Sequence, residues 1–331
     1  MDDPGPLNQG QSQHHPIGEG FLFSRGNSIM AKLAKRRTLR VQDAVSGLVL
    51  VLPAFLLYFL FVLYPTIEAG WIGFHRWDGF SKDMKWIGLN NYKFVFQDDV
   101  FWLAMRNSLK YSIVVTIAKN VLGILLAVLI NRKIRLQAFF RTTIFIPVTL
   151  AFVVVGVLWS WIYNPNFGLL NSLLRELNLE VLIRGWLSDP KLALYSIMAV
   201  DIWRWTGYHV ILLLAGLQAI PKDLYEAAEI DGAGPISQFI KITIPLLVPI
   251  FFVSIILSFT GGFVSNYDFV YTMTGGGPNH STEVALTWIV NTAFNYGAVG
   301  KANAMSLILF VLLAVVSLPS FLIRFRSQRE G

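Results

Sequence analysis

A run of chemically capable side chains lies inside a long apolar stretch of this 331-residue chain. Over about three helical turns it holds an acid, a base, two indoles, a phenol and an imidazole: Asp201, Arg204, Trp203, Trp205, Tyr208 and His209. Charge in an apolar segment is costly unless it is paired or hydrated, so it marks a candidate functional site. Asp201 and Arg204 stand three residues apart and can pair on one helix face. Such groups beside flat aromatic rings suit a sugar, which needs hydrogen bonds and ring contacts together. The alternative is structural: aromatic side chains at a membrane interface plus a buried ion pair.

A second candidate is the polar segment Glu226–Gly232, which separates two long apolar runs. We expect a short helix that begins near Pro221, with Asp223 and Glu226 forming a capping box. Leu224, Ala227 and Ala228 share one face of that helix, and the small alanines allow the backbone of a partner to come close. Gly232 and the following Gly234-Pro235 end the helix and reverse the chain. This pattern predicts a docking surface.

The composition is that of a membrane protein. Hydrophobic residues make up 54% of the chain, charged residues only 14%, and the mean hydropathy is +0.55. Soluble domains carry about 25% charged residues. A membrane-spanning helix needs about 20 apolar residues, because its backbone groups must be satisfied within the segment. Six stretches meet that requirement: residues 44–64, 107–130, 138–163, 193–217, 242–263 and 303–323. Pro147 is expected to bend the third of them.

The basic residues predict the orientation in the membrane. The net charge of +7 is concentrated before the first span, in the second-to-third connection and after the last span. The positive-inside rule then places both termini and the Glu226–Gly232 segment in the cytoplasm. This distribution argues against a nucleic-acid partner. Residues 1–40 are expected to form a disordered basic tail, and residues 41–331 the membrane domain. The first apolar run is read as an uncleaved anchor.

Several classes of site are disfavoured. The chain has no cysteine, so disulfides and cysteine-based metal sites are excluded, and no metal site is predicted. The loop Gly275-Gly276-Gly277-Pro278 is rich in glycine, but no strand precedes it and no lysine follows at the spacing of a phosphate-binding loop. We expect a tight turn there. No constellation of His, Asp and Glu has catalytic spacing, which argues against a membrane enzyme.

The motif loop resembles the E-A-A-x3-G-x9-I-x-L-P signature of permease subunits in ABC importers, with Ile244 in place of leucine. Other motifs of carbohydrate permeases occur in the right order: G-L-N-N-Y, F-x-P, W-x-x-T-G-Y, A-G-L-Q-x-I-P and T-G-G-G-P. The similarity covers roughly residues 40–325. It is closest in kind to the first permease subunit of maltose-type importers. It implies an all-α membrane protein with six transmembrane helices, the type I ABC importer permease fold and a cytoplasmic coupling helix.

The resemblance also implies roles for individual residues. The residues of the coupling helix, which binds a separate ATPase subunit, would be Tyr225, Glu226, Ala227, Ala228, Asp231, Gly232 and Ala233. Those of the substrate cavity are Asp201, Arg204, Trp205, Tyr208, Ser258, Gly262, Asn266 and Tyr267. Tyr208 matches a sugar-contacting aromatic of the family. Ser258 and Asn266 match polar contact positions with a spacing that can differ by one residue. The loop Gly275–Pro278 is expected to face a binding protein.

The implied assembly is a bacterial inner-membrane sugar importer that works by alternating access. Its partners would be a second homologous permease, two cytoplasmic ATPase subunits, an extracytoplasmic solute-binding protein and the lipid bilayer. The chain itself would hold no cofactor, because the ATPase subunits bind ATP and magnesium. Two alternatives stay open. One is an anionic sugar-like solute, a sulfonated sugar or a glycerol phosphodiester, with Arg204 as its counter-ion. The other is a secondary carrier, which needs a coupling acid at mid-membrane.

Overall fold

The computed structural model describes residues 47–131 and 135–327, with side chains to Val315. The predicted tail, residues 1–40, lies outside these residues. The chain divides into two compact units, residues 1–68 and 69–331, and each is described by itself. The first unit contributes most of the helix Gly47–Ile72, which contains the π-helical segment η1 (Phe59–Leu63) and ends in α2 (Tyr64–Ile72). Its large apolar side chains, such as Leu50 and Phe61, are exposed, as suits contact with lipid.

The second unit is almost entirely helical, with one short hairpin. Its elements that precede α8 are β1 (His75–Arg76), β2 (Lys85–Trp86), α3 (Asn90–Phe96), α4 (Asp99–Asn131), α5 (Gln137–Thr149), α6 (Phe152–Ile162), α7 (Leu169–Glu176) and η2 (Glu180–Leu182). Its later elements are α8 (Ala193–Ala219), α9 (Lys222–Ile230), α10 (Pro235–Gln238), η3 (Phe239–Thr243), α11 (Ile244–Val264), α12 (Asn266–Met273), α13 (Ala285–Val290), η4 (Asn291–Asn295) and α14 (Val299–Ser327). β1 and β2 are antiparallel, with His75 opposite Trp86.

Four helical segments of the described residues are long and apolar enough to cross a membrane: Gly47–Ile72, Asp99–Asn131, Ala193–Ala219 and Pro235–Met273. They coincide with four of the six predicted spans. The sixth predicted span falls on α14, whose portion Val299–Val315 is a shorter apolar helix. The total of six spans stays a prediction.

The third predicted span is not one continuous helix. α5 and α6 meet at an angle of 97°. α5 continues through Pro147, and the break comes at Leu150 and Ala151, whose backbone is extended. The expected bend is present, therefore, but it follows the proline by three residues. The backbone carbonyls that the break leaves without helical partners need another donor.

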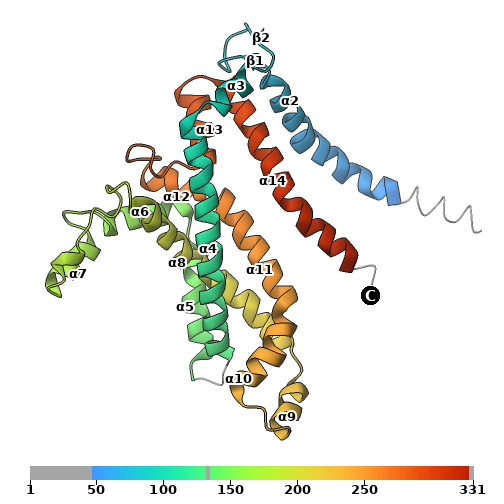
Figure 1. The fold of residues 1–331 in the computed structure, drawn as a ribbon, viewed down its shortest axis with the longest axis vertical. Coiled ribbons are helices and arrows are strands. Elements are labelled where there is room, and N and C mark those ends of the chain that lie inside the picture. Colours follow the sequence, from blue (N-terminus) through green and yellow to red (C-terminus); the bar gives the residue numbers. More distant parts are fainter. Residues whose placement is uncertain (1–46, 132–134, 328–331) are drawn as a thin grey trace, which may run out of the picture. The chain divides into compact units, whose positions relative to one another are not determined.

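The centre of this unit is formed by α4, α8 and α11. α8 packs along α4, and α11 packs against both (Figure 1). Gly262 brings α11 close to α4, since a Cβ there would be 2.9 Å from Val115 Cγ2 and 3.0 Å from Ser112 Cα. α11 runs through Gly261-Gly262 without a break, and Gly262 is the one of the two that packs closely on α4. At Gly207 of α8 a Cβ would meet the Ile144 carbonyl of α5.

The helix α9 and the hairpin lie near opposite ends of α4 (Figure 1). α9 is the short helix expected before Gly232, which ends it with φ +79°. The predicted capping box is absent: the helix begins at Lys222, Pro221 is its N-cap residue, and no side chain caps it. Asp223 therefore lies one residue inside the first turn. α10 and η3 then lead into α11.

Candidate functional site

A cavity of about 280 Å³ lies where α4, α8 and α11 meet. Its lining combines rings, hydroxyls, one ammonium group and one imidazole: Lys119, Trp205, Tyr208, His209, Leu257, Ser258, Gly261 and Ser265. Three candidates from the sequence, Trp205, Tyr208 and Ser258, are brought together here. They come from two helices about 50 residues apart in the chain. The cavity is thus built by tertiary packing.

Trp205 and Tyr208 form the aromatic part of the wall. They stand three residues apart on α8, so their side chains project from the same side of the helix. Their rings are 6.0 Å apart and meet edge to face. Both residues are half-buried. An indole face and a phenol hydroxyl at one cavity can offer ring contact and a hydrogen bond to the same ligand.

The lysine of the lining forms a buried ion pair. Lys119 Nζ of α4 lies 2.7 Å from Asp201 Oδ2 of α8, and the side chains are 3% and 0% exposed. The pairing of Asp201 with Arg204 expected from their spacing is wrong. The carboxylate reaches across to the neighbouring helix, because α8 packs against α4 along its length. A buried charge is tolerated when a partner of opposite sign is in contact with it.

Arg204 has a different role, at the break between α5 and α6. Its guanidinium donates to Leu150 O at 2.7 Å from Nη2 and 3.3 Å from Nε, and to Val148 O at 3.2 Å. The guanidinium carbon lies 3.9 Å from the ring centroid of Phe152 and 4.7 Å from that of Trp205. Arg204 thus supplies the donors that the broken helix lacks, and it does not line the cavity.

A buried hydrogen-bond network joins the three helices beside the cavity. Ser254 Oγ of α11 donates to Asn120 Oδ1 of α4 at 2.6 Å, and Asn120 Nδ2 donates to Ser258 Oγ at 2.9 Å. The His209 ring of α8 completes the network, with Nδ1 2.8 Å from Ser254 Oγ and Nε2 3.1 Å from Ser258 Oγ. Because its members are buried and bond to one another, the network fixes the relative positions of the three helices.

The other candidates on α11 and α12 do not line this cavity. Gly262 and Asn266 face α4: the glycine packs on Val115, and Asn266 Nδ2 lies 3.5 Å from Ser108 Oγ. Tyr267 stacks on Tyr271, with ring centroids 5.5 Å apart. The residues that line the cavity are instead Gly261, which precedes Gly262, and Ser265, which precedes Asn266.

Sequence reasoning included His209 in the polar-aromatic run of α8 but did not assign it to the cavity, and it did not select Lys119, Asn120 or Ser254. A signal for Lys119 was present, because it is a charged residue inside the predicted span 107–130. Asn120 follows it directly. Ser254 carried no comparable signal, since a lone serine in an apolar segment is common.

The short helix α9 holds most residues of the candidate docking surface. Glu226, Ala227 and Asp231 are exposed, and Ala228 and Ala233 are half-buried. The Tyr225 hydroxyl is 2.8 Å from Thr243 Oγ1, which ties α9 to the segment that leads into α11.

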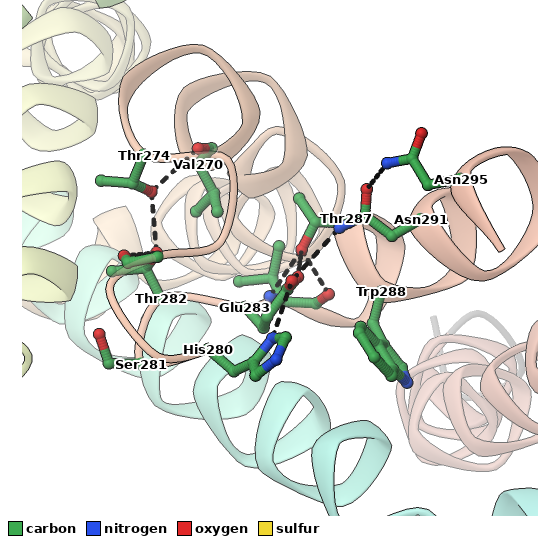
Figure 2. A network of polar contacts seen from close by, with 12 residues as sticks. Val270, Thr274, His280, Ser281, Thr282, Glu283, Thr287, Trp288, Asn291 and Asn295 are labelled. Carbon is green, nitrogen blue, oxygen red and sulfur yellow. Dashed lines mark hydrogen bonds and ion pairs between the residues drawn. The ribbon is translucent and has the colours of Figure 1, made fainter.

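At the other end of α4, the loop that contains Gly275–Pro278 is held by a buried carboxylate. Figure 2 shows Glu283 among its partners. Thr287 Oγ1 donates to Glu283 Oε2 at 2.5 Å, and Asn291 Nδ2 donates to Oε1 at 3.3 Å. Gly276 has φ +93° and packs so closely on this carboxylate that a side chain would collide with it. The expected tight turn is present, and Glu283 fixes its shape.

A second polar contact of this end joins the start of α4 to α14. Lys301 Nζ and Asp98 Oδ2 are 2.7 Å apart, and the Trp288 indole also donates to Oδ2, at 3.3 Å. Burial by itself raises the pKa of Asp98, but the hydrogen bonds from Lys301 and the Phe101 amide outweigh it and hold the pKa below its ordinary value. Asp98 is therefore a stable anion at neutral pH.

No group of three or more metal-ligating side chains occurs among the described residues.

Comparison with known sequences gives consistent matches. The profile of the family described as "Binding-protein-dependent transport system inner membrane component" matches residues 119–329. The probable ABC transporter permease protein YurN of Bacillus subtilis is 36% identical over 279 residues, which are 84% of this chain and 95% of that protein. The trehalose/maltose transport system permease protein MalF of Thermococcus litoralis is 33% identical over 275 residues, 83% of this chain and 92% of that protein.

A solved structure has the same fold. A chain of a bacterial ABC transporter involved in the import of the acidic polysaccharide alginate superimposes with a TM-score of 0.75. The superposition covers 88% of this chain and 99% of the other, at 22% sequence identity. At that identity the likeness concerns the fold alone.

Proposed function

Because the chain belongs to the family of binding-protein-dependent transport system inner membrane components, we propose that it forms the substrate path of an ATP-driven importer of sugars or sugar derivatives. It would receive the sugar from an extracytoplasmic binding protein and release it into the cytoplasm by alternating access. A second homologous permease would complete the path, and two ATPase subunits would supply the hydrolysis.

The cavity between α4, α8 and α11 is the observation that carries this proposal. It lies among three helical segments that are long enough to span a membrane. Its volume of about 280 Å³ is just below the usual range for ligand pockets, so it suits one sugar ring. Trp205 would contact the apolar face of the ring, while Tyr208 and Ser258 would bond to its hydroxyls.

Tyr208 provides the test of this placement. Replacing Tyr208 with Ala removes ring contact and one hydrogen bond, worth about 1–3 kcal/mol together. Uptake by the reconstituted complex should therefore fall about ten- to a hundredfold. Tyr208→Phe is the matched control: it keeps the ring, so its uptake should lie between that of the wild type and that of Tyr208→Ala. Sugar affinity of the separate binding protein should not change. Near-normal uptake by Tyr208→Ala would rule out the sugar at this wall.

The end of α4 near which α9 lies would be the cytoplasmic end, and the end near the hairpin would be the outer one. Basic residues before the first span and after the last support this orientation. The absence of native cysteine makes it directly testable by single-cysteine labelling. Ile230 on α9 is 87% exposed, and Tyr296 near the Glu283 loop is 62% exposed.

We expect an impermeant maleimide to label Tyr296→Cys in intact cells. Ile230→Cys should react only after the membrane is permeabilised, because the bilayer keeps the reagent from the cytoplasmic face. The cysteine-free parent chain is the background for both. The reverse labelling pattern would refute the orientation and, with it, the assignment of α9 to the ATPase side.

Two contacts in the structure bear on the two alternatives. An anionic sugar would need Arg204 as counter-ion, but that guanidinium is bonded to Leu150 O and Val148 O away from the cavity. A secondary carrier needs a free coupling acid, whereas Asp201 is paired with Lys119. Uptake that stops on ATP depletion and resists a proton ionophore would separate the importer from the carrier.

A further inference from the structure

We propose that the Lys119–Asp201 ion pair makes the cavity selective for uncharged sugar rings over anionic ones. This inference rests on the proposed function, since it defines the substrate class of the same cavity. It assigns a specificity-determining role to a pair of residues on different helices.

The charge of the cavity wall comes from one residue. Among the residues that line it, Lys119 is the one with a permanent charge. Its ammonium is 2.7 Å from a carboxylate oxygen of Asp201, which is itself fully buried behind it. A solute in the cavity therefore meets a neutralised ammonium. The remaining N–H groups of Lys119 can still donate to sugar hydroxyls, because an ammonium has three donors.

Three other charged or titratable groups on the surrounding helices lie outside the lining or are in contact with other protein groups. The Arg204 guanidinium faces the α5–α6 break and lies between carbonyls and aromatic rings. Asp268 of α12 is half-buried and is not part of the lining. Both ring nitrogens of His209 are within hydrogen-bond distance of the Ser254 or Ser258 hydroxyl. The net charge of the wall thus depends on whether Asp201 is present.

Removing that carboxylate should reverse the selectivity. At an effective dielectric constant of about 20, an unpaired charge about 4 Å from an anion changes affinity by more than about a hundredfold. Asp201 cancels most of this attraction in the native chain. Without it, an anionic ring should be bound in preference to a neutral one, by about tenfold or more.

The experiment compares two probes, methyl glucoside and methyl glucuronide, which differ only in a hydroxymethyl group against a carboxylate. Binding to the purified transporter, with its partner subunits, is followed by tryptophan fluorescence. Trp205→Phe gives the background from the other tryptophans of the chain and its partners. The wild type should prefer the glucoside and Asp201→Asn the glucuronide. The double variant Lys119→Met/Asp201→Asn, which removes both charges, should regain the wild-type preference.

A second variant protects the test against misfolding of Asp201→Asn. Gly261 lines the cavity and has open space around the position of a Cβ. Gly261→Lys adds an ammonium that no carboxylate of the lining neutralises, so it should shift the preference toward the glucuronide as well. The same ratio of affinities in the wild type and in both charged variants would overturn the proposal.

Failure of the proposed function is recognised separately. A wild type that binds neither ring would contradict a sugar site. The effect of Asp201 on the charge of the cavity wall would then be measured by quenching of Trp205 fluorescence. Acrylamide is neutral and iodide is an anion of small size. Iodide quenching is normalised to acrylamide quenching. A normalised value that is weak in the wild type and several times stronger in Asp201→Asn supports the role of the ion pair. Equal iodide quenching in both overturns it.

Discussion

Replacing Ala227 with Arg should abolish ATP-driven uptake while leaving the chain in the membrane. Ala227 is exposed on α9, and its small side chain lets the backbone of a partner come close. An arginine placed in such a contact is a buried charge without a partner, which costs several kcal/mol. Since about 1.4 kcal/mol is a factor of ten, uptake should fall by about a hundredfold or more.

The control is Ala227→Ser, which keeps the small size and should retain most of the uptake. Two measurements accompany transport: the amount of assembled complex and the stimulation of ATP hydrolysis by the loaded binding protein. The arginine variant should lose the stimulation along with transport. Normal stimulation in that variant would show that α9 does not transmit the signal from the ATPase.

Replacing Arg204 with Met should cause a large loss of stability. It leaves the carbonyls of Leu150 and Val148 without their buried donors and removes the contact with the Phe152 ring. Each unsatisfied buried group costs about 1–3 kcal/mol, so the total should be about 4 kcal/mol. Thermal unfolding of the detergent-solubilised chain measures it.

Arg175→Met is the matched control, because Arg175 also donates to backbone carbonyls but is exposed. Its removal should change stability by less than about 0.5 kcal/mol. Arg204→Lys should give an intermediate loss, since a point-like ammonium cannot bond both carbonyls and stack on a ring. An unfolding temperature of Arg204→Met equal to that of the wild type would mean that the break does not depend on this side chain.

The long helices could be predicted from the sequence because apolar length is a one-dimensional property. In hydrocarbon the backbone must satisfy itself within each segment, and runs such as residues 107–130 leave helix as the one solution. The break at Leu150 could not be placed in this way. Pro147 indicated a bend, but the carbonyl group at the break bonds to Arg204, whose sequence separation from Leu150 is 54 residues.

The resemblance to the permease family predicted three residues of the cavity lining, Trp205, Tyr208 and Ser258. The spacing of Trp205 and Tyr208 also places their side chains on one side of α8. The partner of Asp201 could not be predicted from spacing, because local spacing favours Arg204 whereas Lys119 is 82 residues away. On α11 and just after it, the lining includes Ser258, Gly261 and Ser265, whereas Gly262 and Asn266 face α4. A shift of one residue turns a helix by about 100°, which is enough to exchange these faces.

Lys119 is also synthesised 82 residues before Asp201, and this order bears on how the protein is made. When α4 leaves the translocon, its ammonium has no counter-charge, and inserting a lysine near the centre of a helix costs about 3 kcal/mol. The apolar residues of the 33-residue helix can offset that cost, so α4 can insert alone. Asp201 arrives later on a helix that already contains Arg204. Biogenesis is therefore complete only when α8 has docked beside α4 and the two charges have met.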